Sequence, residues 1–148
     1  MVDSLLGRWL YSVLSASSQP REPLRDELLG AWPGDSAEPF TVLWYVLNLL
    51  AHHVSVEDND RISKLVHAAA SSIDDRHDID EAWIASTARV VLGDREASLP
   101  DISPDAMAVM CAALCAVLVR QESVADQALE AAISRAERAS VQQGINLP

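Results

Sequence analysis

Long uncharged stretches with helical spacing dominate the pattern of hydrophobic and polar positions along this chain. Residues 39–56 carry no formal charge over eighteen positions, and residues 106–119 lack charge, glycine and proline over fourteen. A helix that is apolar around most of its circumference has no side to offer to water, so neighbouring elements must enclose it. The pattern therefore predicts two buried helices, at about 39–54 and 104–120, at the centre of the fold.

Local signals mark the start of the second buried helix. Ser103 is a typical N-cap, Pro104 suits the first helical turn, and Asp105 favours the positive end of the helix dipole. A rotation of about 100° per residue then separates large side chains from small ones. The large ones form one arc, which we expect to fill the core: Met107, Met110, Leu114, Val117 and Leu118. The alanines form the other arc, where a partner helix can approach: Ala108, Ala112, Ala113 and Ala116.

Amphipathic segments predict further helices around these two. They begin near residue 5, at Pro23, after the Ser55 and Asp58 capping pair, near residue 81, and after the Ser123 and Asp126 capping pair. On the last helix, the predicted inward side chains are Ala125, Ala128, Leu129, Ala132, Ile133 and Ala136. The predicted outward ones are Asp126, Glu130, Glu137 and Arg138.

The fold class follows from the absence of any segment that fits the period of a strand better than that of a helix. We predict an all-α, compact single-domain bundle of six or seven helices. It is expected to span residues 1–140, with 141–148 as a flexible C-terminal tail.

Composition and charge narrow the classes of function. The net charge of −11 disfavours a nucleic-acid partner, because neutralising phosphates requires an excess of Lys and Arg. The only cysteines, Cys111 and Cys115, lie one turn apart in a predicted buried helix, which excludes a disulfide framework. No basic region precedes an apolar run at the N-terminus, and polar residues interrupt 39–56. These features predict a cytoplasmic protein without a membrane span, and ten Arg among eleven basic residues favour a bacterial source.

Acidic residues are concentrated between positions 57 and 81. Three basic residues, Arg61, Lys64 and Arg76, leave this segment with a local charge of 3 − 8 = −5. The eight acids are Glu57, Asp58, Asp60, Asp74, Asp75, Asp78, Asp80 and Glu81. Some of them suit helix starts, and we predict that the others form an acidic face for another protein with a basic patch.

A polar stripe interrupts the first buried helix. Thr41, Tyr45, Asn48 and His52 follow the spacing i, i+4, i+7 and i+11, which places them on one side of a helix. Three interpretations are open: a pocket for a small ligand, a hydrogen-bond network between helices, or a partly exposed helix edge. We favour the last two together.

Residues that suit divalent metals are found in the same third of the chain. A few of them resemble the metal ligands of the HD-type phosphohydrolases: His52, His53, His77 and Asp78, with Asp101 or Asp105. The resemblance implies an all-helical hydrolase with a divalent metal. In that family the His-Asp dipeptide usually ends an apolar helix, whereas here it lies in the acidic segment 74–81. We therefore do not assign the chain to the family.

The predicted function is a non-enzymatic helical protein–protein interaction or regulatory domain. An inhibitor, an immunity-type protein or an adaptor with an acidic binding face and no cofactor fits the absence of phosphate-loop, paired-cysteine zinc and nucleophile-elbow motifs. One alternative is a metal-dependent, HD-like hydrolase that uses the His- and Asp-rich region 52–81. Another is a helical small-molecule-binding protein that uses the polar stripe.

Overall fold

The computed structural model of the chain describes residues 5–14, 37–73 and 79–144. This part of the chain contains six α-helices, one 3-10 turn and no strand, which confirms the all-α prediction. The elements are α1 (Leu5–Leu14), α3 (Ala37–Leu50), η1 (Ala51–His53), α4 (Asn59–Ser72), α5 (Glu81–Val91), α6 (Pro104–Gln121) and α7 (Asp126–Gln142). The helix predicted after Pro23 lies outside the described residues.

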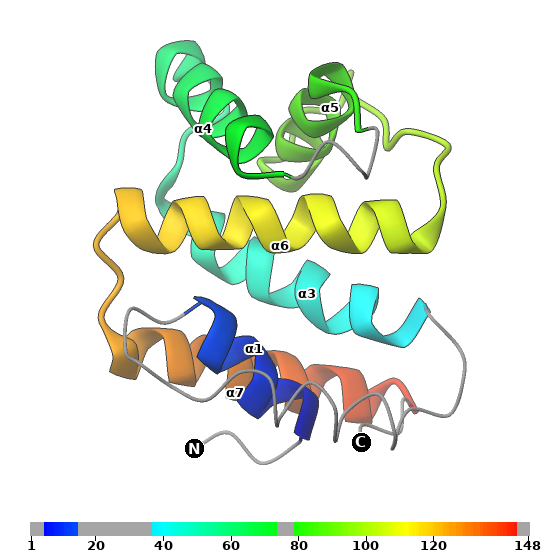
Figure 1. Cartoon of the computed structure of the whole chain (residues 1–148), viewed down its shortest axis with the longest axis vertical. Coiled ribbons are helices and arrows are strands. Elements are labelled where there is room, and N and C mark those ends of the chain that lie inside the picture. The colour runs from blue at the N-terminus through cyan, green and yellow to red at the C-terminus, as the bar shows by residue number, and fades with distance from the viewer. Residues whose placement is uncertain (1–4, 15–36, 74–78, 145–148) are drawn as a thin grey trace.

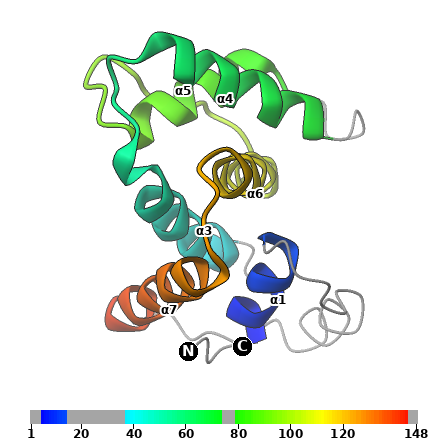
Figure 2. The same cartoon turned by 90° about the vertical axis from the view of Figure 1, so that its left-hand side faces the viewer.

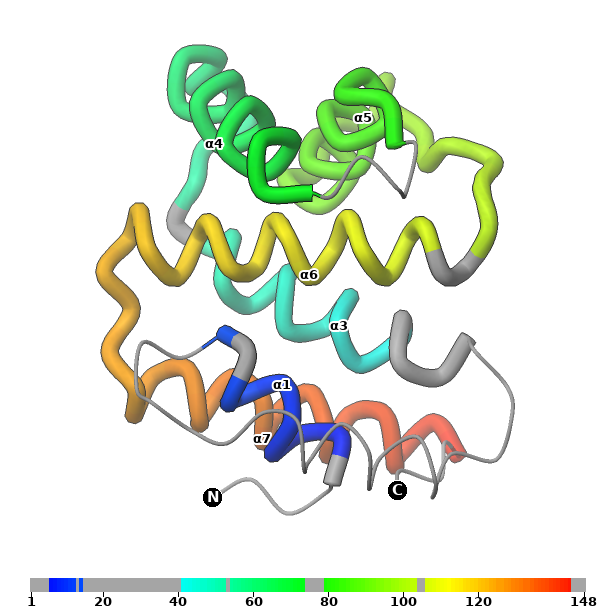
Figure 3. The backbone as a smooth tube through the Cα atoms, in the orientation of Figure 1, coloured from blue at the N-terminus to red at the C-terminus, as the bar shows by residue number. Residues whose placement is uncertain are grey.

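The helices stack in tiers, with α6 in the middle (Figure 1). The hairpin formed by α4 and α5 lies on one side of α6, and α3 lies on the other, as the end-on view of α6 shows (Figure 2). Below α3, α7 packs against both α3 and α1. Figure 3 follows the chain from α3 up through η1 to the α4–α5 hairpin and back down into α6. The two helices predicted to be buried, α3 and α6, therefore form the centre of the fold.

Burial along α6 matches the predicted arcs. Its large side chains are buried, and its alanines are half-buried against the core. The buried set is Met107, Met110, Leu114, Val117 and Leu118, together with Cys111, Cys115 and Val119. In α3, the buried side chains include Val42, Leu43, Val46 and Leu47. No helix of the described chain has both the length and the apolar character needed to cross a membrane.

Ser103 caps α6 as predicted. Its Oγ accepts a hydrogen bond from the Ala106 N–H at 3.2 Å, and Pro104 occupies the first turn. We expect Ser103→Ala to lower the free energy of unfolding by about 1 kcal/mol, because one amide at the helix start loses its acceptor. Thermal melting followed by circular dichroism measures this change. Ser63→Ala, at an exposed site inside α4, is the matched control and should not destabilise the protein; equal melting of both variants would contradict the capping role.

Two other predicted caps are wrong in detail. The N-cap of α4 is Asp58, whose Oδ1 accepts from the Arg61 N–H at 3.1 Å, whereas Ser55 accepts from the Glu57 N–H before the helix begins. The N-cap of α7 is Ala125, without a side-chain hydrogen bond, instead of Ser123.

Ser123 does not cap α7 because it terminates α6. Its φ is 50°, its N–H donates to the Arg120 carbonyl at 3.3 Å, and the Val124 N–H donates to the Val119 carbonyl at 3.0 Å. This pair of bonds is a Schellman motif, with a serine in the left-handed position that glycine usually occupies. Gly93 ends α5 in the same way, with a φ of 89°.

The exposed side of α7 also differs from the prediction. Glu137, predicted to face solvent, is only 6% exposed, whereas Ala125 and Ala128, predicted to face the core, are exposed. The reason is that α7 packs against α3 and α1 together, so the buried arc is wide and is rotated toward Glu137. The helix continues to Gln142, past the predicted boundary at 140, and residues 145–148 of the predicted tail lie outside the described residues.

The first buried helix changes type before its predicted end. The α-helical part stops at Leu50, and Ala51–His53 form a 3-10 turn, with the Val54 N–H donating to the Ala51 carbonyl at 3.0 Å. This tighter turn leads the chain out of the core toward α4.

Candidate functional site

Five of the eight predicted acidic-face residues are described, and all five are exposed. Two of them are helix N-caps. Asp58 caps α4, and Asp80 caps α5, where its Oδ1 accepts a hydrogen bond from the Ala82 N–H at 2.9 Å. Glu57 and Asp60 have no hydrogen bond or ion pair with their side chains among the described residues. The side chains of Asp74, Asp75 and Asp78 lie outside the described residues.

The α4–α5 hairpin divides these acids into two groups. α4 and α5 run antiparallel, because Arg89 Nη2 donates to Asn59 Oδ1 at 3.1 Å at one end, while His67 Nδ1 lies 3.6 Å from Glu81 Oε1 eight residues further along α4. Eight helical residues correspond to about 12 Å. The acids near Asn59 and those near Glu81 are thus further apart than the screening length of about 8 Å at physiological ionic strength.

The polar stripe lies on a partly exposed side of α3. Thr41 and Tyr45 are half-buried, whereas Asn48 and His52 are exposed. Gln143 Nε2 donates to Tyr45 Oη, which joins α3 to the end of α7, and Asn48 Nδ2 donates to the Trp44 carbonyl of its own helix at 2.8 Å. His52, the last residue of the stripe, also lines a groove that is described below.

The proposed metal ligands are described only in part. His52 is exposed, but the side chain of His53 and the whole of His77 and Asp78 lie outside the described residues. In sequence, the two histidines precede α4, a helix of 14 residues, and the His-Asp dipeptide follows it. Within the described ranges, no three His, Cys, Asp or Glu side chains gather to hold a metal ion.

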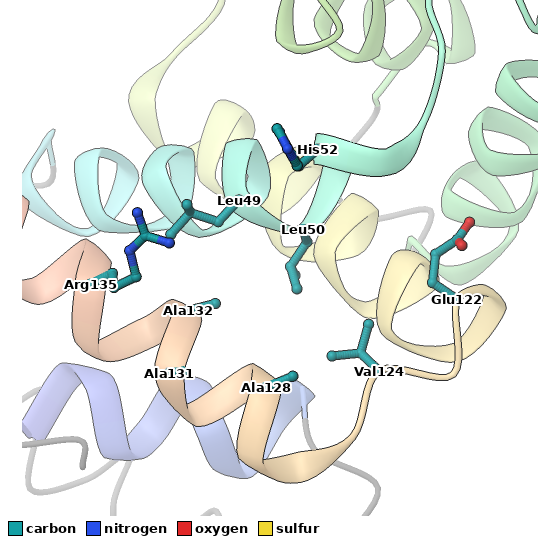
Figure 4. A pocket seen from close by; sticks show the side chains of 9 residues that line it. All are labelled: Leu49, Leu50, His52, Glu122, Val124, Ala128, Ala131, Ala132 and Arg135. Atoms are coloured by element: carbon teal, nitrogen blue, oxygen red, sulfur yellow. The ribbon is translucent and has the colours of Figure 1, made fainter.

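A groove that the sequence did not predict lies between α7 and the end of α3. It has a volume of about 730 Å³. Its lining comes from three separate segments: Leu49, Leu50 and His52, Glu122 and Val124, and Ala128, Ala131, Ala132 and Arg135. Figure 4 shows the leucines of α3 across from the alanines of α7, with Arg135 at one end and Glu122 at the other.

The groove has an apolar floor and charged ends. Glu122 also forms an ion pair with Arg61 of α4, which ties the turn after α6 to the upper hairpin. Arg135 is exposed and has no hydrogen bond or ion pair to the described part of the chain. The sequence contained only a weak signal for this groove, because the spacing of Ala128 and Ala131 suits a core face as well as an exposed one.

The cysteines lie away from both surfaces. Cys111 and Cys115 are buried in α6 and are free thiols. Burial raises the pKa of the Cys111 thiol to about 12. Burial also raises the pKa of Cys115 well above its usual range, and the neighbouring Cys111 adds to this effect. Neutral, enclosed thiols are poor nucleophiles and poor metal ligands, so these two serve packing.

Comparison of the chain with models of protein families, with curated proteins and with solved structures found no match.

Proposed function

We propose that this chain is a non-enzymatic helical interaction or regulatory domain, of the inhibitor, immunity-type or adaptor kind, that binds a basic partner protein. The observation that supports this function best is the exposure of carboxylates on the outermost tier, formed by α4 and α5. Glu57, Asp60 and Glu81 are exposed there and hold no helix cap. We assign the recognition of the partner's cations to these three side chains.

The hairpin offers more to a partner than charge. A shallow hollow of about 340 Å³ lies between α4 and α5. Its lining includes the charged residues Glu81 and Arg89 and the apolar residues Val66, Ala82 and Ala85. An apolar side chain of the partner fits this hollow while cations engage the two acidic groups. Charged groups at the edge of an interface mainly steer association, so the acids should accelerate binding more than they prolong it.

The net charge of −11 also belongs to this proposal, because it disfavours a phosphate backbone as partner and attracts a basic protein. The proposal also includes a cytoplasmic location and a function that requires no cofactor. Asp74, Asp75 and Asp78 extend the proposed acidic surface on the basis of the sequence alone.

Charge-matched variants test the acidic surface. Glu57→Gln with Asp60→Asn removes two negative charges from the upper tier, and Asp126→Asn with Glu130→Gln removes two from α7 as the control. We expect proteins captured from a lysate of the source organism to bind the first variant about tenfold less than wild type at about 0.01 M salt, where charges act over about 30 Å. The control should bind like wild type, and the difference between the first variant and wild type should shrink at about 1 M salt.

Equal capture by wild type and both variants at each salt concentration would reject the acidic surface. The acids would then act only as helix caps and solubilising charges. Thermal melting of each variant shows that any loss of capture does not come from unfolding.

A further inference from the structure

The groove between α3 and α7 carries a second inference, which does not depend on the acidic surface of the upper tier. We propose that the groove receives α7 of a second copy of this chain, so that two copies form a dimer with two-fold symmetry. In this dimer each α7 enters the groove of the other copy.

The shape of α7 suits this arrangement. The helix forms one wall of the groove (Figure 4). Ala128 and Ala131 are both exposed on it, one turn apart. Small side chains allow two helices to pack at the short end of the usual interaxial range of about 8 to 10 Å. A narrow edge of this kind fits between Leu49 and the alanines of the opposite copy.

The charges of the groove are self-complementary. Arg135 lies at one end and Glu122 at the other, with the apolar floor between them (Figure 4). A two-fold axis near Ala128, about halfway between positions 122 and 135, turns α7 of the second copy antiparallel, which brings its Arg135 toward Glu122 of the first copy and the reverse. In such an isologous contact every favourable pair occurs twice.

Both charged groups are available for this pairing. Arg135 has no hydrogen bond or ion pair to the described residues. Glu122 pairs with Arg61 through Oε1, but its side chain is still 25% exposed. A carboxylate has about four acceptor sites, so Glu122 can accept a second guanidinium. Salt screens the repulsion between two copies of net charge −11 over distances beyond about 8 Å at physiological ionic strength.

The openness of the groove favours a protein helix over a small molecule. A small ligand is usually buried over about 70 to 90% of its surface. Here Ala128, Ala131 and His52 are exposed, so a small molecule would be covered mainly by the floor of the groove. A helix of the second copy supplies the missing cover and the opposite charges together.

The oligomeric state of the full chain tests this proposal. Sedimentation equilibrium between about 1 and about 100 µM is expected to show the mass of a dimer for wild type at the upper end of the range. Ala128→Arg places a long cation where the two α7 helices meet, opposite the same cation of the other copy, and is expected to weaken dimerisation at least about tenfold. Arg135→Glu replaces an attraction with a repulsion and should have the same effect. Ala82→Arg, an exposed alanine of α5, is the control and should leave the dimer intact.

Wild type that is monomeric throughout this range would overturn the proposal. A dimer that persists unchanged in both Ala128→Arg and Arg135→Glu would place the interface elsewhere and overturn it too. If Ala128→Arg fails to melt cooperatively, Ala128→Glu, which places two like charges at the same exposed position, takes its place in the comparison.

Discussion

Leu114→Asp is expected to abolish folding. Leu114 is 0% exposed and lies at the middle of α6, the helix that separates α3 from the α4–α5 hairpin. An unpaired carboxylate at this position costs several kcal/mol, because burial removes the water that solvates it. The total stability of a domain of this size is only about 5 to 15 kcal/mol. The variant should therefore show low soluble yield and no cooperative melting transition by circular dichroism.

The same substitution at an exposed leucine is the matched control. Leu99 is 42% exposed in the loop before α6, and Leu99→Asp should change the free energy of unfolding by no more than about 0.5 kcal/mol. Soluble Leu114→Asp protein that melts near the wild-type temperature would show that α6 is not the centre of the core.

Neither cysteine of the native protein is expected to react with iodoacetamide at a measurable rate near pH 8. The reactive species is the thiolate, and a rise of the Cys111 pKa from 9.0 to about 12 lowers its thiolate fraction about a thousandfold. Cys115 is 0% exposed and its pKa is raised in the same direction. Labelling then requires opening of the core, so its rate should rise by about a thousandfold or more in denaturant. Mass spectrometry counts the labelled thiols over time.

An exposed thiol in the same protein calibrates this measurement. Ser63→Cys places a cysteine on the solvent side of α4, and it should react within the time that a denatured chain needs. If Cys111 or Cys115 reacted in the native state as fast as this introduced cysteine, one side of α6 would be open to solvent and the packing described above would be wrong.

The sequence by itself determined where most helices lie and which side of α6 is buried. Ser103 and the Ala106 N–H are three residues apart, and Gly93 ends α5 through bonds to carbonyls of the same helix. Such contacts involve only neighbours along the chain, so the residue types at these positions predict them. The uncharged run of α6 likewise predicted an enclosed helix, because each of its faces would otherwise expose apolar surface.

Predictions from local sequence were wrong where a residue suited one structural role by its type but has another role in the fold. Ser123 suits an N-cap, but the chain uses it in a left-handed conformation to end α6, so α7 begins without a side-chain cap. Glu137 suits a solvent face by its charge, but α1 and α3 cover that side of α7. In both cases a neighbouring element, and not the sequence of the segment itself, determined the role of the residue.

Only the tertiary structure decided how the acidic residues and the groove are arranged. The acidic stretch is continuous in sequence, but the antiparallel pairing of α4 with α5 places its described members in two groups. The groove joins Leu49 and Leu50 to Ala128 and Ala131, which are nearly eighty positions away. Helix formation depends on contacts within about four residues, whereas the choice of which helix faces meet depends on burying the apolar surface of the whole chain at once.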